Sequence, residues 1–319
     1  MTSRDPNALL DDARSGSRVA LARLLTYVES GGERHRAVVA QAYRAPVPYV
    51  VGITGPPGAG KSTLVDRVIS TALQEGSFGG HHEFSQIAIL AIDPTSPFTG
   101  GAILGDRVRM QDHALDERVF IRSMATRGHL GGLSLAVPDA VRVLGAAGFT
   151  LVLVETVGVG QMEVEIASAA DTTVVVAIPG AGDAMQANKA GLLEIADLFV
   201  INKADRPDTQ SVRRDLEQML DFGGDRAWRP TITDTVATDG RGVEELWRQI
   251  VAHRTHLDET GELFTRRAQR AGIELERVLA ATLASRVSTL AAGTRWEAQV
   301  AALIAGDTDP YSAVDQLLA

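Results

Sequence analysis

The chain has 319 residues, of which 45% are hydrophobic and 22% charged, so it carries enough apolar material for one large or two modest cores. Its 40 acidic residues outnumber the 31 basic ones, the net charge is −9, and no Lys/Arg-rich run forms the basic face that a nucleic-acid partner needs. Cysteine is absent, which excludes disulfides, thiolate metal ligands and cysteine nucleophiles. Residues 1–16 lack the apolar core of a signal peptide, and apolar runs such as 174–178 are too short to span a bilayer, so we expect a cytoplasmic protein with no membrane partner.

Residues 1–46 form the first predicted unit, an N-terminal helical extension. Its apolar residues, among them Leu9, Leu10, Leu24 and Leu25, recur at helical spacing, with breaks near residues 16 and 31. The prolines of the segment 45–48 then end the helical pattern and admit a strand.

A glycine-rich loop follows the apolar run 49–53 and precedes a segment of helical spacing. The loop fits the pattern G-x-x-x-x-G-K-[ST], in which glycines let backbone N–H groups turn toward phosphate oxygens at the positive end of a helix. Lys61 would reach the β- and γ-phosphates, and the Ser62 hydroxyl would hold Mg²⁺. This pattern between a strand and a helix indicates a nucleotide site rather than an ordinary turn; its residues are Gly55, Pro56, Pro57, Gly58, Ala59, Gly60, Lys61, Ser62 and Thr63.

From residue 49 to about 256, short apolar runs alternate with segments of helical spacing, which is typical of a parallel sheet covered by helices on both faces. We therefore predict an α/β fold, a P-loop NTPase domain over 47–256 with a mostly parallel central sheet. The expected strands are 49–54, 87–92, 119–122, 150–155, 173–178, 197–202 and 231–236. Ligands of such sheets bind at the carboxyl ends of the strands, so residues that follow each strand are the candidates for chemistry.

Three carboxylates near strand ends are candidate Mg²⁺ ligands alongside Ser62. Glu155 ends the apolar run 151–154 three residues before Gly158, in the position where most GTPases carry Asp-x-x-Gly. Asp93 follows the strand at 87–92, and Asp106 lies in a glycine-rich segment that could close over a phosphate. For each acid the alternative is a helix cap or an ordinary surface charge.

The group that activates water is less clearly marked. Gln161, three residues after Gly158, is the nearest side chain for orienting a water molecule, although its offset differs from that in Ras-like GTPases. The candidates for an arginine that stabilises transition-state charge are Arg109, Arg122 and Arg127, each with the alternative of a structural or surface role.

A second motif, Asn202-Lys203-Ala204-Asp205, follows the apolar run 198–201 and predicts guanine specificity. The Asp205 carboxylate can accept hydrogen bonds from N1–H and the 2-amino group of guanine, and adenine offers neither donor. Asn202 and Lys203 would support and cover the base. After the last strand come Val236, Ala237 and Thr238, where GTPases usually carry a Ser-Ala loop whose backbone N–H reads guanine O6; here valine replaces the serine, and a backbone contact by Ala237 survives that change.

Residues 257–319 return to helical spacing and form the third predicted unit. Leu263, Ile273, Leu279 and Leu283 belong to a long amphipathic pattern that Gly293 interrupts. This C-terminal helical extension is expected to be either an additional packing layer or an arm for dimerisation.

Several stretches together resemble one family. They are 93–110, Arg122 to Gly132, Glu155 to Gln161 and Pro179 to Gln186, with weaker likeness in the N-terminal helices and at Asp309-Pro310-Tyr311. The combination is similar to the GTPases that chaperone adenosylcobalamin-dependent acyl-CoA mutases, the bacterial MeaB proteins and the methylmalonic aciduria type A protein, whose relatives have been called LAO/AO transport system kinases.

The resemblance implies a homodimer that binds GTP or GDP with Mg²⁺ and has an acyl-CoA mutase as its partner. It implies that GTP binding and hydrolysis gate the loading of adenosylcobalamin and protect the mutase, which for this chain would be methylmalonyl-CoA mutase or a related enzyme. By position, Lys61, Ser62, Asp93, Asp106 and Glu155 match residues for nucleotide and Mg²⁺, and Asn202, Lys203 and Asp205 match the base-reading motif. The segment 179–189 matches an additional switch loop, with Asp183 and Lys189 at positions that couple to the partner.

Two other functions remain open at this stage. A P-loop kinase of a small molecule or transport protein would need a second substrate pocket and would usually prefer ATP, which the motif at 202–205 disfavours. A GTPase that inserts a metal such as nickel would rely on Cys/His clusters, and this chain has no cysteine and 7 scattered histidines.

Overall fold

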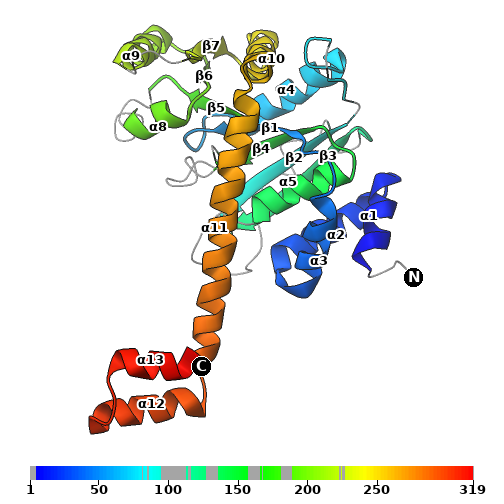
Figure 1. Ribbon diagram of the computed structural model, residues 1–319. Coiled ribbons are helices and arrows are strands. Elements are labelled where there is room, and N and C mark those ends of the chain that lie inside the picture. Colours follow the sequence, from blue (N-terminus) through cyan, green and yellow to red (C-terminus); the bar gives the residue numbers. More distant parts are fainter. Residues whose placement is uncertain are drawn as a thin grey trace. The chain divides into compact units, whose positions relative to one another are not determined.

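A computed structural model describes residues 5–80, 82–84, 86–94, 113, 116–126, 136–156, 166, 168–180, 189–222, 224 and 227–318. Within these residues, the core is a seven-stranded sheet in the order β3-β2-β4-β1-β5-β6-β7 (Figure 1). All neighbouring strands are parallel. The strands are β1 (Tyr49–Thr54), β2 (Ile87–Pro94), β3 (Val119–Thr126), β4 (Leu151–Thr156), β5 (Thr172–Ala177), β6 (Leu198–Asn202) and β7 (Thr231–Thr235).

The strand register places the carboxyl ends of the strands at one edge of the sheet. Ile53 of β1 lies beside Glu155 of β4 on one side and beside Val174 of β5 on the other. Since β1 is flanked by both strands, the loop that follows β1 is framed by the ends of β4 and β5. This is the edge where an open parallel sheet binds ligands.

One face of the sheet is covered by the N-terminal helices and α5. These helices are α1 (Pro6–Arg14), α2 (Arg18–Ser30), α3 (Gly32–Ala42) and α5 (Ala136–Ala146). Leu24 and Leu25 of α2 belong to the same buried cluster as Leu90 of β2 and Val152 of β4. Polar contacts add to this core, because Arg122 of β3 pairs with Glu29 of α2 and the Arg14 Nε donates to the Ala146 carbonyl at 2.9 Å. The N-terminal helices therefore share the hydrophobic core of the sheet.

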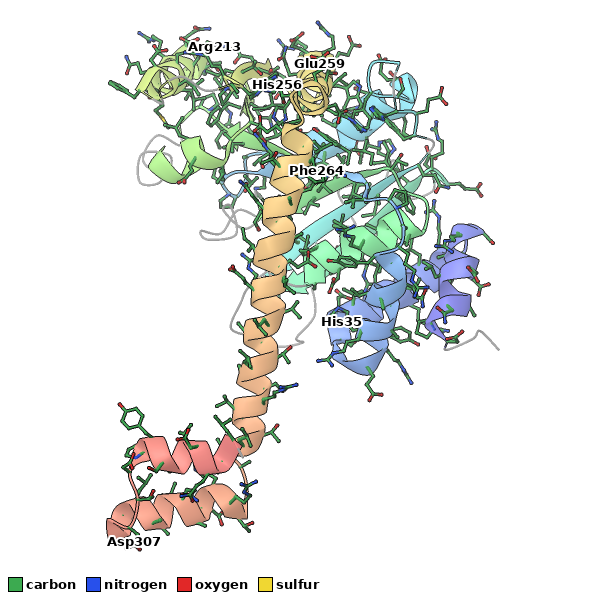
Figure 2. All side chains as sticks on the ribbon, in the orientation of Figure 1. His35, Arg213, His256, Glu259, Phe264 and Asp307 are labelled. Carbon is green, nitrogen blue, oxygen red and sulfur yellow. The ribbon has the colours of Figure 1, made fainter. Side chains whose placement is uncertain are left out.

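The opposite face is covered by α4 (Lys61–Glu75) and α10 (Val243–Thr260), which pack on Val51, Leu153 and Val200. Two phenylalanines extend this core: Phe78 stacks on Trp247 of α10, and Phe84 meets the same ring edge-on. The shorter α8 (Lys189–Ile195) and α9 (Thr209–Phe222) complete the first face beside β5 and β6, where they cover Phe199. Figure 1 shows the sheet between these helical layers, and Figure 2 shows side chains filling the space between sheet and helices.

A buried polar cluster lies at the amino ends of β5 and β6, opposite the carboxyl edge. Arg267 Nη2 donates to Asp171 at 2.6 Å, and Arg266 Nη1 donates to Asp197 at 2.9 Å. The His253 ring lies 3.3 Å from Asp197 and hydrogen-bonds Thr172 at 2.8 Å. Through these contacts the first two turns of α11 (Glu262–Leu290) are tied to the sheet.

The chain divides into two compact units, Met1–Arg267 and Ala268–Ala319. The second unit contains the rest of α11, α12 (Thr294–Ala305) and α13 (Pro310–Leu318). Its two short helices pack together around Ala313 and Leu317, and Arg295 donates to the Gln316 carbonyl at 2.6 Å. In the part of the chain that the structure describes, no helix is long and apolar enough to cross a bilayer.

The observed architecture confirms the predicted fold class, a mostly parallel sheet flanked by helices with further helices at both ends. The strands begin and end within a few residues of the predicted bounds.

Candidate functional site

The loop at 55–60 follows β1 and leads into α4, whose first residue is Lys61. Gly55, Gly58 and Gly60 all have positive φ, at 145°, 74° and 83°. A Cβ on Gly55 would lie 2.3 Å from the Val176 carbonyl oxygen, so only glycine lets the loop pass this close to β5. The sequence thereby shapes a loop whose backbone wraps around the N-terminus of α4, the geometry that binds anions.

Lys61 and Ser62 are both buried at the start of α4. The Lys61 Nζ donates to the Gly55 carbonyl at 2.8 Å and to the Pro56 carbonyl at 3.0 Å, so the ammonium lies across the mouth of the loop. The Ser62 Oγ donates to Glu155 Oε1 at 2.6 Å. Glu155 is itself only 4% exposed, and its carboxylate therefore acts in a region largely closed to water.

Ser62 and Glu155 together suit a magnesium ion. A serine hydroxyl and a carboxylate at hydrogen-bond distance are hard oxygen ligands of the kind that Mg²⁺ prefers, directly or through water. The strand ends beneath this pair are joined by a further buried contact, because the hydroxyls of Thr54 and Thr156 lie 2.9 Å apart. That contact fixes the end of β1 against the end of β4, directly below the glycine-rich loop.

The predicted base-reading motif lies against the same loop from the other side. The Asn202 amide Nδ2 donates to the Ala59 carbonyl at 2.7 Å, and the Lys203 Nζ donates to the Gly58 carbonyl at 2.7 Å. Lys203 adopts a positive φ of 60°, which is rare for a residue other than glycine. A Cβ on Gly60 would lie 2.6 Å from Asn202 Nδ2, so this close approach also needs a glycine.

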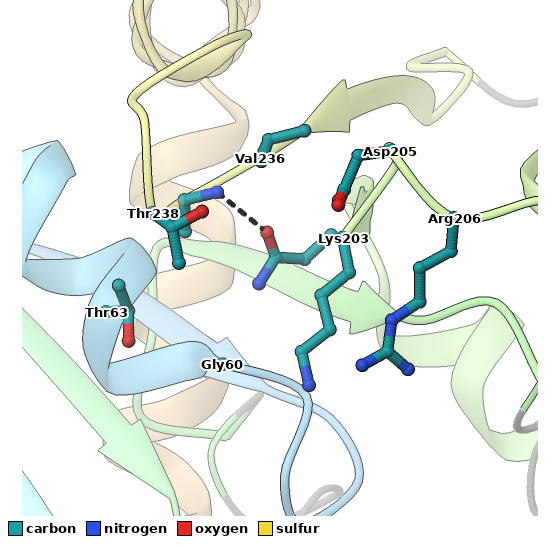
Figure 3. Close-up of a pocket in the computed structure, with 9 residues that line it drawn as sticks. Gly60, Thr63, Lys203, Asp205, Arg206, Val236 and Thr238 are labelled. Carbon is teal, nitrogen blue, oxygen red and sulfur yellow. Dashed lines mark hydrogen bonds between the residues drawn. The ribbon is translucent and has the colours of Figure 1, made fainter.

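A cavity of about 230 Å³ opens between the motif and α4 (Figure 3). In Figure 3, the Asp205 carboxylate points in among the other lining residues, and the long side chains of Lys203 and Arg206 lie next to it. The residues that line it are Gly60, Thr63, Asn202, Lys203, Asp205, Arg206, Val236, Ala237 and Thr238. The cavity thus joins the predicted base motif, the predicted loop after β7 and the end of the glycine-rich loop.

The loop after β7 is held by Asn202, whose Oδ1 accepts from the Ala237 amide at 3.1 Å and from the Thr235 hydroxyl at 3.2 Å. The dashed line in Figure 3 marks the contact with Ala237. Asn202 therefore binds two loops at once with the two ends of its amide. Val236 is buried and adds only apolar surface to the cavity wall.

Other predicted residues lie elsewhere or outside the description. The Asp93 backbone is near the end of β2, next to Ala125 of β3, but its side chain is outside the described part. Arg122 pairs with Glu29 and with the Thr26 hydroxyl, and so serves the packing of α2 on β3. The predicted residues that fall wholly outside the described chain are Asp106, Arg109, Arg127, Gly158, Gln161 and Asp183, and the Lys189 side chain is also outside it.

The sequence analysis missed three residues that the structure places at the site: Arg206, Thr235 and Arg67. Arg206 directly follows the base motif, and that adjacency could have marked it. Thr235 ends β7 just before the predicted loop. Arg67 of α4 contacts the carbonyls of Ala237 and Thr238, and no local pattern relates positions that far apart.

Comparison with protein families gives one match over most of the chain. Residues 21–292 match the model of "Methylmalonyl Co-A mutase-associated GTPase MeaB". A Pyrococcus abyssi protein that bears a GTPase name is 47% identical over 317 residues, covering 97% of this chain and 95% of that protein.

Two further relatives extend the comparison. The GTPase ArgK of Escherichia coli is 40% identical over 81% of this chain and 78% of its own length. The mitochondrial methylmalonic aciduria type A homolog of Mus musculus is 32% identical over 79% of this chain and 64% of its own. Among solved structures, an LAO/AO transport system kinase superposes with a TM-score of 0.69 at 27% identity, over 99% of this chain and 97% of that one.

Proposed function

The chain belongs to the MeaB family of methylmalonyl-CoA mutase-associated GTPases, and on that premise we propose that it binds Mg²⁺·GTP and hydrolyses it to GDP and phosphate. The observation that carries the proposal is the double contact of Asn202, which joins the glycine-rich loop to the loop after β7 beside a cavity that Asp205 faces. A phosphate site and a base site are thus connected by one side chain.

At the phosphate end, the backbone amides of 55–60 and the Lys61 ammonium are proposed to bind the β- and γ-phosphates. Lys61 would exchange its two carbonyl partners for phosphate oxygens, a stronger, charge-assisted contact. Ser62 and Glu155 would hold Mg²⁺, with Asp93 and Asp106 as further ligands. When bound, the ion would supply positive charge that stabilises the negative charge on the phosphates. Gln161 is proposed to orient the attacking water.

At the base end, Asp205 is proposed to accept hydrogen bonds from N1–H and the 2-amino group of guanine. Lys203 would cover one face of the ring, since it lines the cavity and its Nζ donates to the Gly58 carbonyl. An amide of the loop 236–238 would donate to O6. Adenine would leave Asp205 without donors, and an unsatisfied carboxylate costs affinity.

The partner is proposed to be an adenosylcobalamin-dependent acyl-CoA mutase such as methylmalonyl-CoA mutase. Support comes from the family description and from the kinship with the methylmalonic aciduria type A homolog. The GTP state would gate cofactor loading and protect the mutase, and the segment 179–189, with Asp183 and Lys189, would couple the nucleotide to the mutase. Pro179 and Gly180 follow β5 at the carboxyl edge, and the backbone of β5 at Val176 closely approaches Gly55 of the glycine-rich loop, which suits such a coupling.

The first test is steady-state phosphate release with GTP or ATP, in the presence and absence of a cobalamin mutase from the same organism. A several-fold rise with GTP and mutase together, abolished in Lys61→Ala, would support a mutase-activated GTPase. Release from ATP at the same rate would favour the kinase alternative and count against guanine specificity.

The cofactor role needs a separate measurement, because a GTPase can bind a mutase without delivering a cofactor. Transfer of adenosylcobalamin to the apo-mutase can be followed by its absorbance with GTP, with GDP and with a non-hydrolysable GTP analogue. Transfer that does not depend on the nucleotide would contradict gating while leaving the GTPase activity in place.

We further propose a division into three parts: an N-terminal extension at 1–46, a GTPase domain at 47–256 and a C-terminal extension at 257–319. The C-terminal extension is proposed to form a dimer. None of the α11 side chains is buried, and its exposed apolar residues include Ile273, Leu275, Val278, Leu279, Leu283 and Val287. Such a stripe on a helix marks a surface that packs against a partner. Sedimentation of the wild type and of a Leu279→Glu, Leu283→Glu double variant tests this: a wild-type monomer would refute it.

A further inference from the structure

The loop 236–238 has no side-chain hydroxyl at Val236, yet the structure shows it tightly held. The Val236 amide donates to the Arg241 carbonyl at 3.0 Å, and the Val236 carbonyl accepts from Asp239 and Gly240. These contacts fix the beginning of the loop at Val236 against the residues that follow it, 239–241. They do not reach the carbonyls of Ala237 and Thr238, two residues that line the cavity.

Those two carbonyls are contacted by Arg67 instead. Arg67 lies on α4 one turn after Thr63, so it is on the same side of the helix as a residue that lines the cavity. Its Nε donates to the Ala237 carbonyl at 3.3 Å and its Nη2 donates to the Thr238 carbonyl at 3.3 Å. One guanidinium therefore ties the helix that begins the phosphate site to the loop of the base site.

The amides of Ala237 and Thr238 differ in their hydrogen bonds. The Ala237 amide already donates to Asn202 Oδ1. The Thr238 amide belongs to the same peptide group as the Ala237 carbonyl, which accepts from Arg67. A cation on the carbonyl of a peptide group withdraws electron density and makes its N–H a stronger donor, as hydrogen bonds in series do. Thr238 lines the cavity, so a ligand there could accept a hydrogen bond from its amide.

We propose that Arg67 is a positioning residue for guanine recognition: it holds the carbonyls of Ala237 and Thr238 and so presents the Thr238 amide to O6 of the base. The inference rests on the proposed function, because it takes guanine as the ligand of this cavity. It shifts the O6 contact from Ala237, where the sequence alone placed it, to the next amide. It also gives a residue of α4 a role in base selection, apart from the phosphates.

The test compares three nucleotides on wild type and Arg67→Met, which keeps a long stem and removes the charge. GDP carries O6, N1–H and the 2-amino group. IDP keeps O6 and lacks the 2-amino group. The 5′-diphosphate of 2-aminopurine riboside keeps the 2-amino group and lacks both O6 and N1–H. Dissociation constants come from calorimetry or from competition with a fluorescent GDP derivative.

The substitution is expected to weaken the binding of GDP and of IDP by the same factor, about five- to tenfold, because the Thr238 amide becomes a weaker and less well positioned donor to O6 once both contacts of Arg67 are lost. The affinity for the 2-aminopurine nucleotide should stay the same, because that base cannot use the O6 donor. Arg67→Lys should recover part of the affinity for GDP and IDP. Arg248→Met on α10, another arginine on a helix surface, is the control and should change none of the three affinities.

An equal loss of affinity for all three nucleotides would overturn the proposal, since it would mean that Arg67 supports the phosphate site or the fold. No weakening of any of them would overturn it as well. A failure of the proposed function is distinguishable, because wild type would then bind ADP as well as GDP before any substitution is made. Thermal unfolding of each variant shows whether it is folded.

Discussion

The Ser62 hydroxyl donates to the Glu155 carboxylate at 2.6 Å, across a gap of 93 residues in the sequence. This contact brings the start of α4 to the end of β4, so two candidate oxygen ligands lie together beside the glycine-rich loop. The same pair supplies a serine and an acid of the kind that hold Mg²⁺ against bound phosphates.

Glu155→Gln should reduce the Mg²⁺ dependence of GTP binding. The amide keeps the size of the side chain and can still contact Ser62, but it has no negative charge for the ion. We expect the increase in affinity on adding Mg²⁺ to fall by about tenfold, which corresponds to roughly 1.4 kcal/mol. Titrations of GTP in Mg²⁺ and in EDTA measure this, with Ser62→Ala as the matched variant on the other ligand. An unchanged ratio of the two affinities would remove Glu155 from the metal site.

Lys61→Ala should abolish tight GTP binding. The substitution removes the buried ammonium that lies on the Gly55 and Pro56 carbonyls and that we expect to meet the phosphates. A decrease of about 100-fold or more in affinity is expected, since charge-assisted hydrogen bonds to two phosphates are removed. Equilibrium binding of a fluorescent GTP derivative tests it, with circular dichroism to show that the variant is folded. Binding as tight as that of wild type would mean that the phosphates are held elsewhere.

Asp205→Asn should relax the preference for guanine and favour xanthine. Xanthine has a carbonyl where guanine has its 2-amino group, and an amide side chain can donate to that carbonyl. We expect GDP affinity to fall and XDP affinity to rise, each by about tenfold. Competition binding with GDP, XDP and ADP measures the change. The exposed Asp215→Asn on α9 is the control, and a pattern shared by both variants would count against base reading by Asp205.

Gly55→Ala should destabilise the protein. The φ of 145° and the 2.3 Å approach of an added Cβ to the Val176 carbonyl force the loop or β5 to move. A cost of about 3 kcal/mol in the free energy of unfolding is expected, from backbone strain and a steric clash together. Gly272→Ala in α11 is the control, because it has open space and an ordinary helical φ. Urea unfolding of both variants compares them, and equal stabilities would contradict the close approach.

Stability at low pH should depend on Asp197. Burial, the largest single effect, raises the pKa of Asp197, but the hydrogen bond and charge of His253, the charge of Arg266 and the Thr173 amide together outweigh it, so the pKa lies below its ordinary value of 3.8. A carboxyl group with a lowered pKa in the folded state stabilises the protein above its unfolded pKa, and this contribution is lost as the pH falls through the folded pKa.

Asp197→Asn should therefore lower the free energy of unfolding at pH 7 by about 3 kcal/mol, since Arg266 and His253 lose their buried partner. Below pH 3.8 the difference from wild type should shrink. Urea unfolding between pH 7 and pH 3 measures it. The exposed pair of Asp221 with Arg229 provides the control, and Asp221→Asn should cost less than about 1 kcal/mol at every pH. A difference from wild type that stays constant with pH would contradict the role of Asp197.

Much of the fold could be predicted because its signals are local. An apolar run followed by glycines and then by helical spacing indicated β1, the glycine-rich loop and α4 within a single stretch of sequence. Such local signals do not predict the order of strands in the sheet. β4 lies between β2 and β1, and its own residues do not indicate which strands are its neighbours. The base motif was visible, but its contact with Ala59 lies 143 residues away in the sequence.

The site shows the same division between local patterns and contacts across the chain. Some candidate residues belong to motifs whose spacing along the chain indicates nucleotide binding: Lys61, Ser62, Asn202 and Asp205. Arg67 belongs to no pattern: it follows Asp66 in an ordinary helical turn, and its contact with Ala237 spans 170 residues. Polar contacts between distant segments form only when the fold brings those segments together. The spacing of residues along the chain does not predict them.

The N-terminal helices have a consequence for shortened versions of the protein. Leu24 and Leu25 of α2 are fully buried in the core that covers β2 and β4, and Glu29 of the same helix pairs with β3 at one edge of the sheet. A chain that begins at residue 47 would keep the whole glycine-rich loop, yet it would expose the apolar surface of the sheet and of α5 that the N-terminal helices cover. A large exposed apolar surface promotes aggregation. Such a fragment should precipitate during expression, and a negative result in a nucleotide assay on it would report aggregation and leave the nucleotide site untested.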